Sequence, residues 1–191
     1  MQVKVAFDSA IFIDEAIKAV KSTIFEALIL VVLVIFLFLR SIRSTLIPFV
    51  TIPVSLIGAF IFLYALGFTI NILTLLGIVL AIGLVVDDAI VVLENIYRHI
   101  EEGMAPRKAA LVGSKEISFA VIAMTITLAA VFTPLAFIPG NTGKLFSEFA
   151  LTVAAAVLVS GFVALTLTPM MCSKLLKHHA KHSAIYNFTE R

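Results

Sequence analysis

The chain has little charge, a single cysteine and no tryptophan. Only 14% of its 191 residues are charged, whereas a soluble domain of this size carries about a quarter. The net charge of +2 is too small to indicate nucleic-acid binding. The one cysteine, Cys172, excludes an internal disulfide and a cysteine-based metal cluster within this sequence. What remains is apolar: 61% of the residues are hydrophobic and the mean hydropathy is +1.14, which indicates an integral membrane protein.

Five long apolar runs predict an all-α membrane protein with five transmembrane helices. We expect the spans at about 24–39, 46–66, 72–93, 117–138 and 146–172. An amphipathic stretch from Ile11 to Glu26 runs without a breaker into the first of them. One helix should therefore start outside the membrane and continue through it, and the membrane domain covers 11–177.

Two polar segments flank that domain. Residues 1–10 contain a short alternating piece, Val3 to Phe7, that has the pattern of a strand. Residues 178–191 form a polar tail with three histidines. We predict no metal site there, because a site needs a fixed ligand geometry that a polar tail does not provide.

Basic residues are unevenly distributed between the two sides of the membrane. Five spans place the two termini on opposite sides. Ten of the fourteen Lys and Arg residues then lie on the side of the C-terminal tail, and four lie on the other side. Since cytoplasmic loops are enriched in Lys and Arg, we expect the C-terminus in the cytoplasm and the N-terminus outside.

The third span contains two adjacent acids, Asp87 and Asp88. On insertion scales a charged aspartate at mid-membrane costs about 2.5–3.5 kcal/mol, so the pair costs about 5–7 kcal/mol. The 15 Leu, Ile and Val residues between Ile72 and Leu93 together contribute roughly 4.5–9 kcal/mol in favour of insertion. The span therefore inserts only marginally unless the carboxylates find partners or take up protons. An ionisable pair at this depth indicates a functional site.

The neighbours of the pair indicate how it is used. Adjacent residues on a helix point about 100° apart, so both carboxylates can face one helix interface but not one small ion. Gly83, one turn earlier, would let another helix approach closely, and Glu94 and Asn95 continue the same faces two turns later. A carboxylate held between burial and a nearby cation can bind and release a proton. The alternative is a salt bridge that only holds helices together.

The cation for such a pair is absent from the spans. None of the five predicted spans holds a basic residue at membrane depth, so the cation must come from another chain or from a missing part of this one. Four hydroxyl side chains of the later spans are candidates for hydrogen bonds between helices or near the aspartates: Thr125, Thr127, Ser160 and Thr166. His99, beside Arg98, is expected at the membrane edge.

The segment Gly77–Asn95 resembles the fourth transmembrane helix of the resistance-nodulation-division (RND) multidrug efflux pumps. The rest of the chain agrees in order. Phe36 to Pro48 is similar to the junction between the second and third helices of that family, and Phe68 to Thr74 to the entry of the fourth. Val131 to Phe137 and Leu165 to Met170 are similar to parts of the fifth and sixth. The resemblance weakens only before Ile11 and after Lys177.

The resemblance implies a multi-pass protein of the bacterial inner membrane that exchanges drugs for protons and is not an enzyme. Asp87 and Asp88 match the proton-relay aspartates of the family, which pair with a lysine in the second half of the family's chain. Family members work as homotrimers with a periplasmic adaptor and an outer-membrane channel, and export hydrophobic and amphiphilic compounds through porter domains. No cofactor, metal ion or nucleic acid is implied.

The resemblance also implies that this sequence is a fragment. It would hold the second to sixth helices of the first half of the membrane domain, with residues 1–10 as the end of a periplasmic porter segment and 178–191 as a cytoplasmic tail. Two other functions remain open. An RND-type transporter could carry another cargo, such as a metal ion, a lipid or an exported protein. An intramembrane aspartyl protease is a remote alternative, because its two catalytic aspartates lie on different helices.

Overall fold

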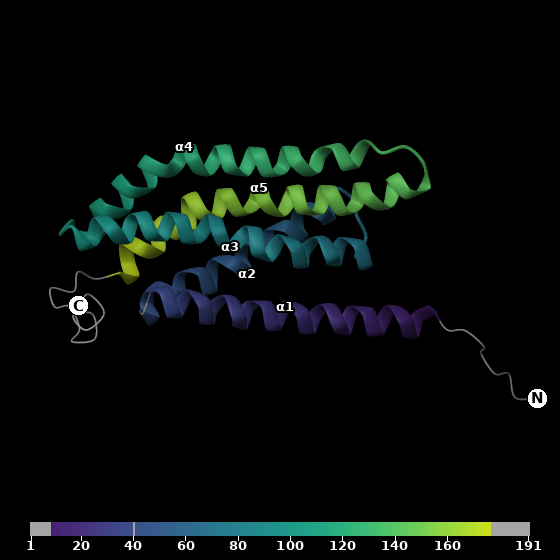
Figure 1. Cartoon of the computed structure of the whole chain (residues 1–191), viewed down its shortest axis with the longest axis horizontal. Coiled ribbons are helices and arrows are strands. Elements are labelled where there is room, and N and C mark those ends of the chain that lie inside the picture. The colour runs from purple at the N-terminus through teal and green to yellow at the C-terminus, as the bar shows by residue number, and fades with distance from the viewer. Residues whose placement is uncertain (1–8, 40, 177–191) are drawn as a thin grey trace, which may run out of the picture.

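The computed structural model describes residues 9–39 and 41–176, and they fold into helices joined by short connections (Figure 1). The strand expected at Val3–Phe7 and the histidine-containing tail lie outside these residues. Within them the all-α prediction is confirmed. The helices are α1 (Ser9–Leu39), α2 (Ile42–Ala65), α3 (Ile72–Glu101), α4 (Pro106–Phe132), the short 3-10 helix η1 (Thr133–Phe137) and α5 (Asn141–Leu175).

Five of these helices are long and apolar enough to cross a membrane. Because an α-helix rises 1.5 Å per residue and the hydrocarbon core is about 30 Å thick, even the shortest candidate span, the 21 residues Ile17–Leu37, suffices. α1 continues without a break from its amphipathic first turns into its apolar run, as expected. α3, with 30 residues, has Asp87 and Asp88 at its midpoint.

Polar side chains and prolines set several helix ends. The Asn71 side chain accepts hydrogen bonds from the backbone N–H groups of Leu73 and Thr74, both at 2.9 Å, and the Thr74 hydroxyl accepts one from the Asn71 N–H at 2.8 Å. This reciprocal cap starts α3 directly after the turn at Gly67, whose φ of 75° suits a residue without a side chain. Pro134 follows the end of α4, which tightens there into η1.

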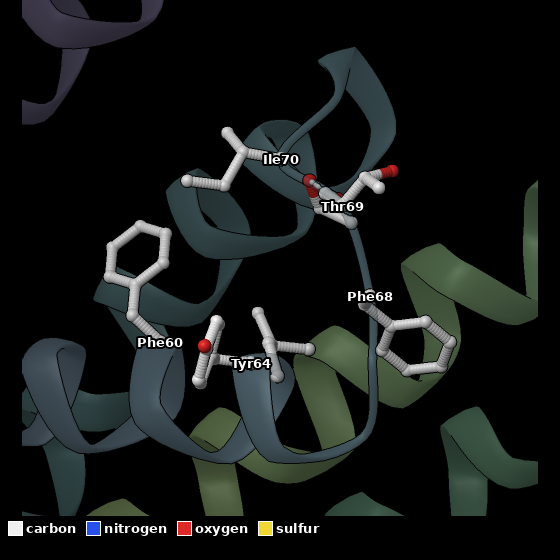
Figure 2. Close-up of a pocket in the computed structure, with 7 residues that line it drawn as sticks. Phe60, Tyr64, Phe68, Thr69 and Ile70 are labelled. Carbon is white, nitrogen blue, oxygen red and sulfur yellow. Dashed lines mark hydrogen bonds between the residues drawn. The ribbon is translucent and has the colours of Figure 1, made fainter.

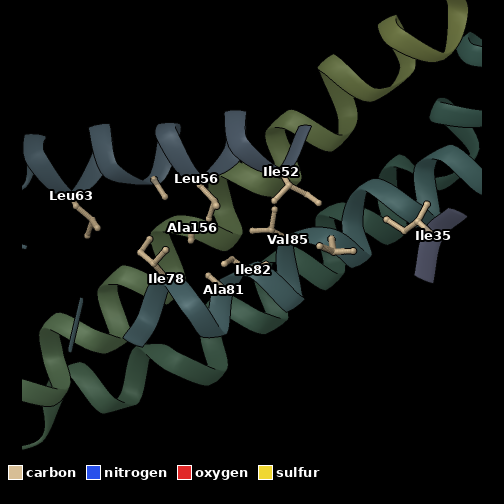
Figure 3. Packing of buried hydrophobic residues seen from close by; sticks show 11 residues of the cluster. Ile35, Ile52, Leu56, Leu63, Ile78, Ala81, Ile82, Val85 and Ala156 are labelled. Atoms are coloured by element: carbon tan, nitrogen blue, oxygen red, sulfur yellow. The ribbon is translucent and has the colours of Figure 1, made fainter. Parts of the chain in front are cut away.

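α5 lies at the centre of the bundle and packs against α2, α3 and α4, whereas α1 contacts only α2 and α3 among the described helices (Figure 1). One apolar cluster joins α1, α2, α3 and α5, with Ile52, Ile78, Val85 and Ala156 among its members (Figure 3). A second cluster joins α2, α3, α4 and α5 nearer to Cys172. The core therefore follows α3 and α5 along their length.

The two ends of the bundle differ in charge. α3 ends and α4 begins at the same end, which we call the basic end. Four of its exposed side chains are Arg98, Arg107, Lys108 and Lys115. The opposite end, which we call the far end, holds the α2–α3 turn and the turn before α5. α3 and α5 both run from the far end to the basic end (Figure 1).

Candidate functional site

α3 presents two contrasting faces around the aspartates. The seam face is buried and packs against α5; it consists of Gly77, Ala81, Val85, Asp88 and Val92. The open face is exposed in the described part of the chain; it consists of Leu76, Leu80, Gly83, Asp87, Glu94 and Arg98. Because neighbouring residues of a helix point about 100° apart, the two aspartates fall on different faces. Within the described chain they do not share one interface.

Asp88 is almost completely enclosed, with 1% of its surface exposed. The Ser160 hydroxyl of α5 donates a hydrogen bond to Asp88 Oδ2 at 2.8 Å, and the same hydroxyl lies 3.2 Å from the carbonyl oxygen of Val85. The other carboxyl oxygen, Oδ1, is buried and has no hydrogen-bond partner among the described residues. The nearby charge that acts on Asp88 is that of Asp87, which has the same sign. A buried carboxylate needs hydrogen bonds and a counter-charge, and here one hydroxyl meets that need in part.

Asp87 lies on the open face, one turn after Gly83. A Cβ atom placed on Gly83 would meet no atom within 4 Å, so no described helix lies against this glycine. We therefore still predict a close helix contact at Gly83, but with a helix outside the described residues. Glu94, two turns beyond Asp87, is exposed on the same face.

The other glycine of this region, Gly77, shows what a close helix contact looks like. A Cβ atom there would lie 3.1 Å from Cγ2 of Thr152 and 3.3 Å from the carbonyl oxygen of Phe149, both on α5. The absence of a side chain therefore allows α3 and α5 to pack closely on the far side of Asp88.

The hydroxyl candidates differ in what they reach. Ser160 is the one that bonds to an aspartate. The hydroxyls of Thr125, Thr127 and Thr166 donate to carbonyl oxygens four residues earlier on their own helices. The sequence placed all four in the spans, but a hydroxyl on a helix can bond to its own backbone or to a neighbour. Only the packing of α3 on α5 selects Ser160.

Asn95 turns away from the open face toward α4. Its amide donates to the carbonyl oxygen of Gly113 at 2.8 Å and to Glu116 at 3.2 Å. Glu116 also lies 2.8 Å from Nε2 of His99 and 3.5 Å from the Arg98 guanidinium. This polar cluster joins α3 to α4 at the basic end.

His99 and Glu116 were not predicted as site residues. His99 was expected at a membrane edge, and it is buried, with 7% of its surface exposed. A signal was present in the sequence, because His99 follows Asp88 by eleven residues, or about three helical turns, and so lies on the same side of α3. The partner, Glu116, could not be found this way, since it comes from another helix.

The far end carries a further polar contact and an apolar pocket. The Asn71 amide donates a hydrogen bond to the Glu148 carboxylate of α5. The pocket, of about 290 Å³, is lined mainly by apolar side chains, among them Phe60, Tyr64 and Phe68 (Figure 2). Its lining residue from α3, Thr74, precedes Asp88 by fourteen residues, or about 20 Å along the helix. The pocket is therefore separate from the aspartates.

The described residues contain no group of three His, Cys, Asp or Glu side chains that could hold a metal ion. Five apolar helices with an aspartate buried at the midpoint of the third define the chain as a multi-pass membrane protein with an ionisable group in its core. Such groups mark ion and substrate pathways.

The chain belongs to the AcrB/AcrD/AcrF family, whose sequence model matches residues 1–191. This confirms the RND resemblance. An uncharacterized transporter of Haemophilus influenzae is 55% identical over 181 residues, which cover 95% of this chain and 18% of that protein. Multidrug resistance protein MdtC of Pantoea ananatis is 50% identical over 183 residues, with 96% and 18% covered. The chain thus spans less than a fifth of these relatives, and their names support a transporter rather than an enzyme.

Proposed function

We propose that this chain is the proton-relay part of a drug/proton antiporter of the bacterial inner membrane, with Asp87 and Asp88 as the relay. The observation that carries the proposal is the position of Asp88: it lies at the midpoint of a 30-residue membrane helix and is buried, with a single hydroxyl donor. A group in this position changes its interactions with α5 whenever it gains or loses a proton. Proton binding can therefore be coupled to a movement between helices.

The open face of α3 supports a second part of the proposal. A charged Asp87 that faced lipid at mid-membrane would cost about 2.5–3.5 kcal/mol. Leu80, Asp87 and Glu94 follow one another at seven-residue intervals and so lie on one side of α3. We propose that a helix outside this chain covers the open face and brings a cation, a lysine by the resemblance, to the two carboxylates.

The charge distribution supports an orientation. The basic end would face the cytoplasm, since Lys and Arg are enriched on that side of membrane proteins. The N-terminus of α1 would then lie on the periplasmic side, next to the end of a porter segment at 1–10. RND multidrug pumps generally work with a periplasmic adaptor and an outer-membrane channel. We extend this to a homotrimer that exports amphiphilic compounds through porter domains outside the chain.

The proposal is tested in a full-length transporter that carries this segment. Asp87→Asn and Asp88→Asn should each lower drug efflux and drug-dependent proton flux by about 100-fold or more, the range of a lost proton-transfer group. Glu101→Gln, at the exposed end of the same helix, is the matched control and should leave both unchanged. If the aspartate variants are inserted in normal amounts and still pump drug with normal proton flux, the relay lies elsewhere.

A further inference from the structure

We infer that His99, together with Glu116, passes protons between Asp88 and the basic end of the bundle. This inference rests on the proposed function, because it concerns the path by which the relay exchanges its proton with the cytoplasm. It starts from the polar cluster between α3 and α4, which the relay itself does not use. Three observations carry it: alignment along α3, the distribution of unpaired polar atoms, and the surroundings of His99.

The alignment follows from helix geometry. Asp88, Val92, Asn95 and His99 are spaced by four, three and four residues, so they lie on one side of α3. The eleven residues from Asp88 to His99 correspond to about 16 Å along the helix axis. A proton cannot cross this distance in one transfer, so bridging groups are needed between the two side chains.

Unpaired polar atoms occur in the half of the bundle that contains Asp88 and His99. Four buried side-chain atoms of the described residues have no hydrogen-bond partner: Ser44 Oγ, Asp88 Oδ1, Thr168 Oγ1 and His99 Nδ1, the last of which lies 3.3 Å from a Glu102 carboxylate oxygen. All four belong to residues between the midpoint of the bundle and its basic end. Ser44 is in the first turn of α2, and Thr168 is two turns beyond Ser160 on α5. Buried polar groups normally bond to protein or to ordered water, so this half of the core is suited to bind water.

The far half of the seam is built differently. The Thr152 hydroxyl donates to the carbonyl oxygen of Glu148 at 2.6 Å, and Asn71 donates to the Glu148 carboxylate. Between this level and Asp88, the seam consists of apolar residues such as Ile78, Ala81 and Ala156, all buried (Figure 3). Buried apolar residues such as Val92 and Ile96 also line the basic side of Asp88, so the two halves differ in their unpaired polar atoms, which the described residues hold on the basic side.

His99 connects this interior to the surface. Its ring is buried, yet Nε2 bonds to Glu116, whose side chain is 47% exposed. Nδ1 faces Glu102 of its own helix at 3.3 Å, and Arg98 lies beside Glu116. Gly113 makes room for the ring, since a Cβ atom there would lie 3.2 Å from His99 Cδ2. The imidazole is thus held against α4 with carboxylates on both sides, a setting in which it can accept and give up a proton.

The proton transfer needs water as its only co-reactant. The O–H bond of protonated Asp88 breaks and its proton joins the first of a chain of bridging waters, and the last water of the chain passes a proton to Nδ1 of His99. The imidazolium then releases its Nε2 proton to Glu116, from which it leaves to water at the basic end, and His99 returns from the Nδ1–H to the Nε2–H tautomer before the next transfer. Asp88 remains as a carboxylate that accepts the Ser160 hydrogen bond, and no water is consumed.

The test uses the full-length transporter reconstituted in liposomes, with the basic end exposed to the medium and an enclosed pH-sensitive dye. Ethidium serves as the transported probe. We expect His99→Ala to lower ethidium-dependent proton flux by about 10-fold or more, and imidazole added to the medium to restore a large part of it, because a diffusible base replaces the missing ring. Glu116→Gln should also slow the flux, and Glu101→Gln, the matched control, should not.

The outcomes separate this inference from the proposed function. Normal flux in His99→Ala would overturn the inference, and so would a slow flux that imidazole does not restore, because that result indicates a structural role for His99. Either result leaves the proposed function in place if Asp88→Asn still abolishes proton flux. Normal flux in Asp88→Asn overturns the proposed function, and the inference with it.

Discussion

The two faces of α3 carry neighbouring aspartates into very different surroundings. On the seam face, small residues such as Gly77 and Ala81 bring α5 close, and Asp88 is enclosed with the Ser160 hydroxyl beside it. On the open face, Asp87 lies exposed between Gly83 and Glu94. The two aspartates are one residue apart, or about 100° of helix rotation. One lies in the packed interface with α5, and the other lies on a face that no described helix covers.

This difference teaches that the two acids cannot be equivalent. Asp88 is positioned by the chain's own packing, so its geometry is set before any partner binds. Asp87 is positioned toward a surface that the described residues do not cover. In the proposed relay, Asp88 links α3 to α5, and Asp87 links α3 to whatever covers the open face.

The largest expected effect is on the free energy of membrane insertion of the isolated span, where neither face of α3 packs against another helix. In an insertion assay on the isolated span Ile72–Leu93, Asp87→Leu and Asp88→Leu should each favour insertion by about 3–4 kcal/mol, because leucine replaces a charged group at mid-membrane. The fraction of glycosylated reporter measures this. Equal effects would show that the difference between the acids arises from packing. A large inequality in the isolated span would contradict that explanation.

A smaller effect should separate the faces in the folded chain. Gly77→Val places a branched side chain against Thr152 and Phe149 and should lower the free energy of unfolding by about 1–3 kcal/mol, as overpacking does. A Cβ atom on Gly83 meets no atom within 4 Å, so Gly83→Val should be nearly neutral in the 191-residue chain. Denaturant unfolding in detergent micelles measures both.

The same two glycine variants test the open face in a full-length transporter. There, Gly83→Val should become harmful, because a covering helix would occupy the space beside Gly83. A neutral Gly83→Val in the full-length protein would argue against close coverage of this face. Gly77→Val should be harmful in both settings.

The smallest effect concerns the hydrogen bond between α3 and α5. Ser160→Ala should lower the free energy of unfolding by about 0.6 kcal/mol, the average for hydrogen bonds between membrane helices. The effect should be smaller in an Asp88→Leu background, since the carboxylate acceptor is then absent and the Val85 carbonyl oxygen remains. Ser173→Ala removes a hydroxyl that bonds to its own helix and serves as the control. An equal loss in both backgrounds would show that Ser160 acts through something other than Asp88.

The helical fold and its main ionisable group were accessible from the sequence. Long apolar runs predict helices because the bilayer leaves the backbone few other ways to satisfy its hydrogen bonds, and two acids inside such a run stand out against their neighbours. The family model confirms the resemblance that Gly77–Asn95 suggested.

The contacts between helices were not accessible in the same way. Ser160 was one of four hydroxyl candidates, and only the packing of α5 on α3 distinguishes it. His99 was expected at an interface, but its burial depends on Gly113 and Glu116 of α4. A periodic pattern gives the faces of one helix, whereas the rotation of two helices against each other depends on their side chains jointly.

The central claim, that Asp88 takes up and releases a proton while it is buried against α5, is tested most directly by infrared difference spectroscopy. The full-length transporter in liposomes is compared with and without an imposed pH gradient. The account predicts a carboxylic acid C=O band that changes with the gradient, disappears in Asp88→Asn and persists in Glu101→Gln. A band that persists unchanged in Asp88→Asn would show that another group carries the proton, and would contradict the account.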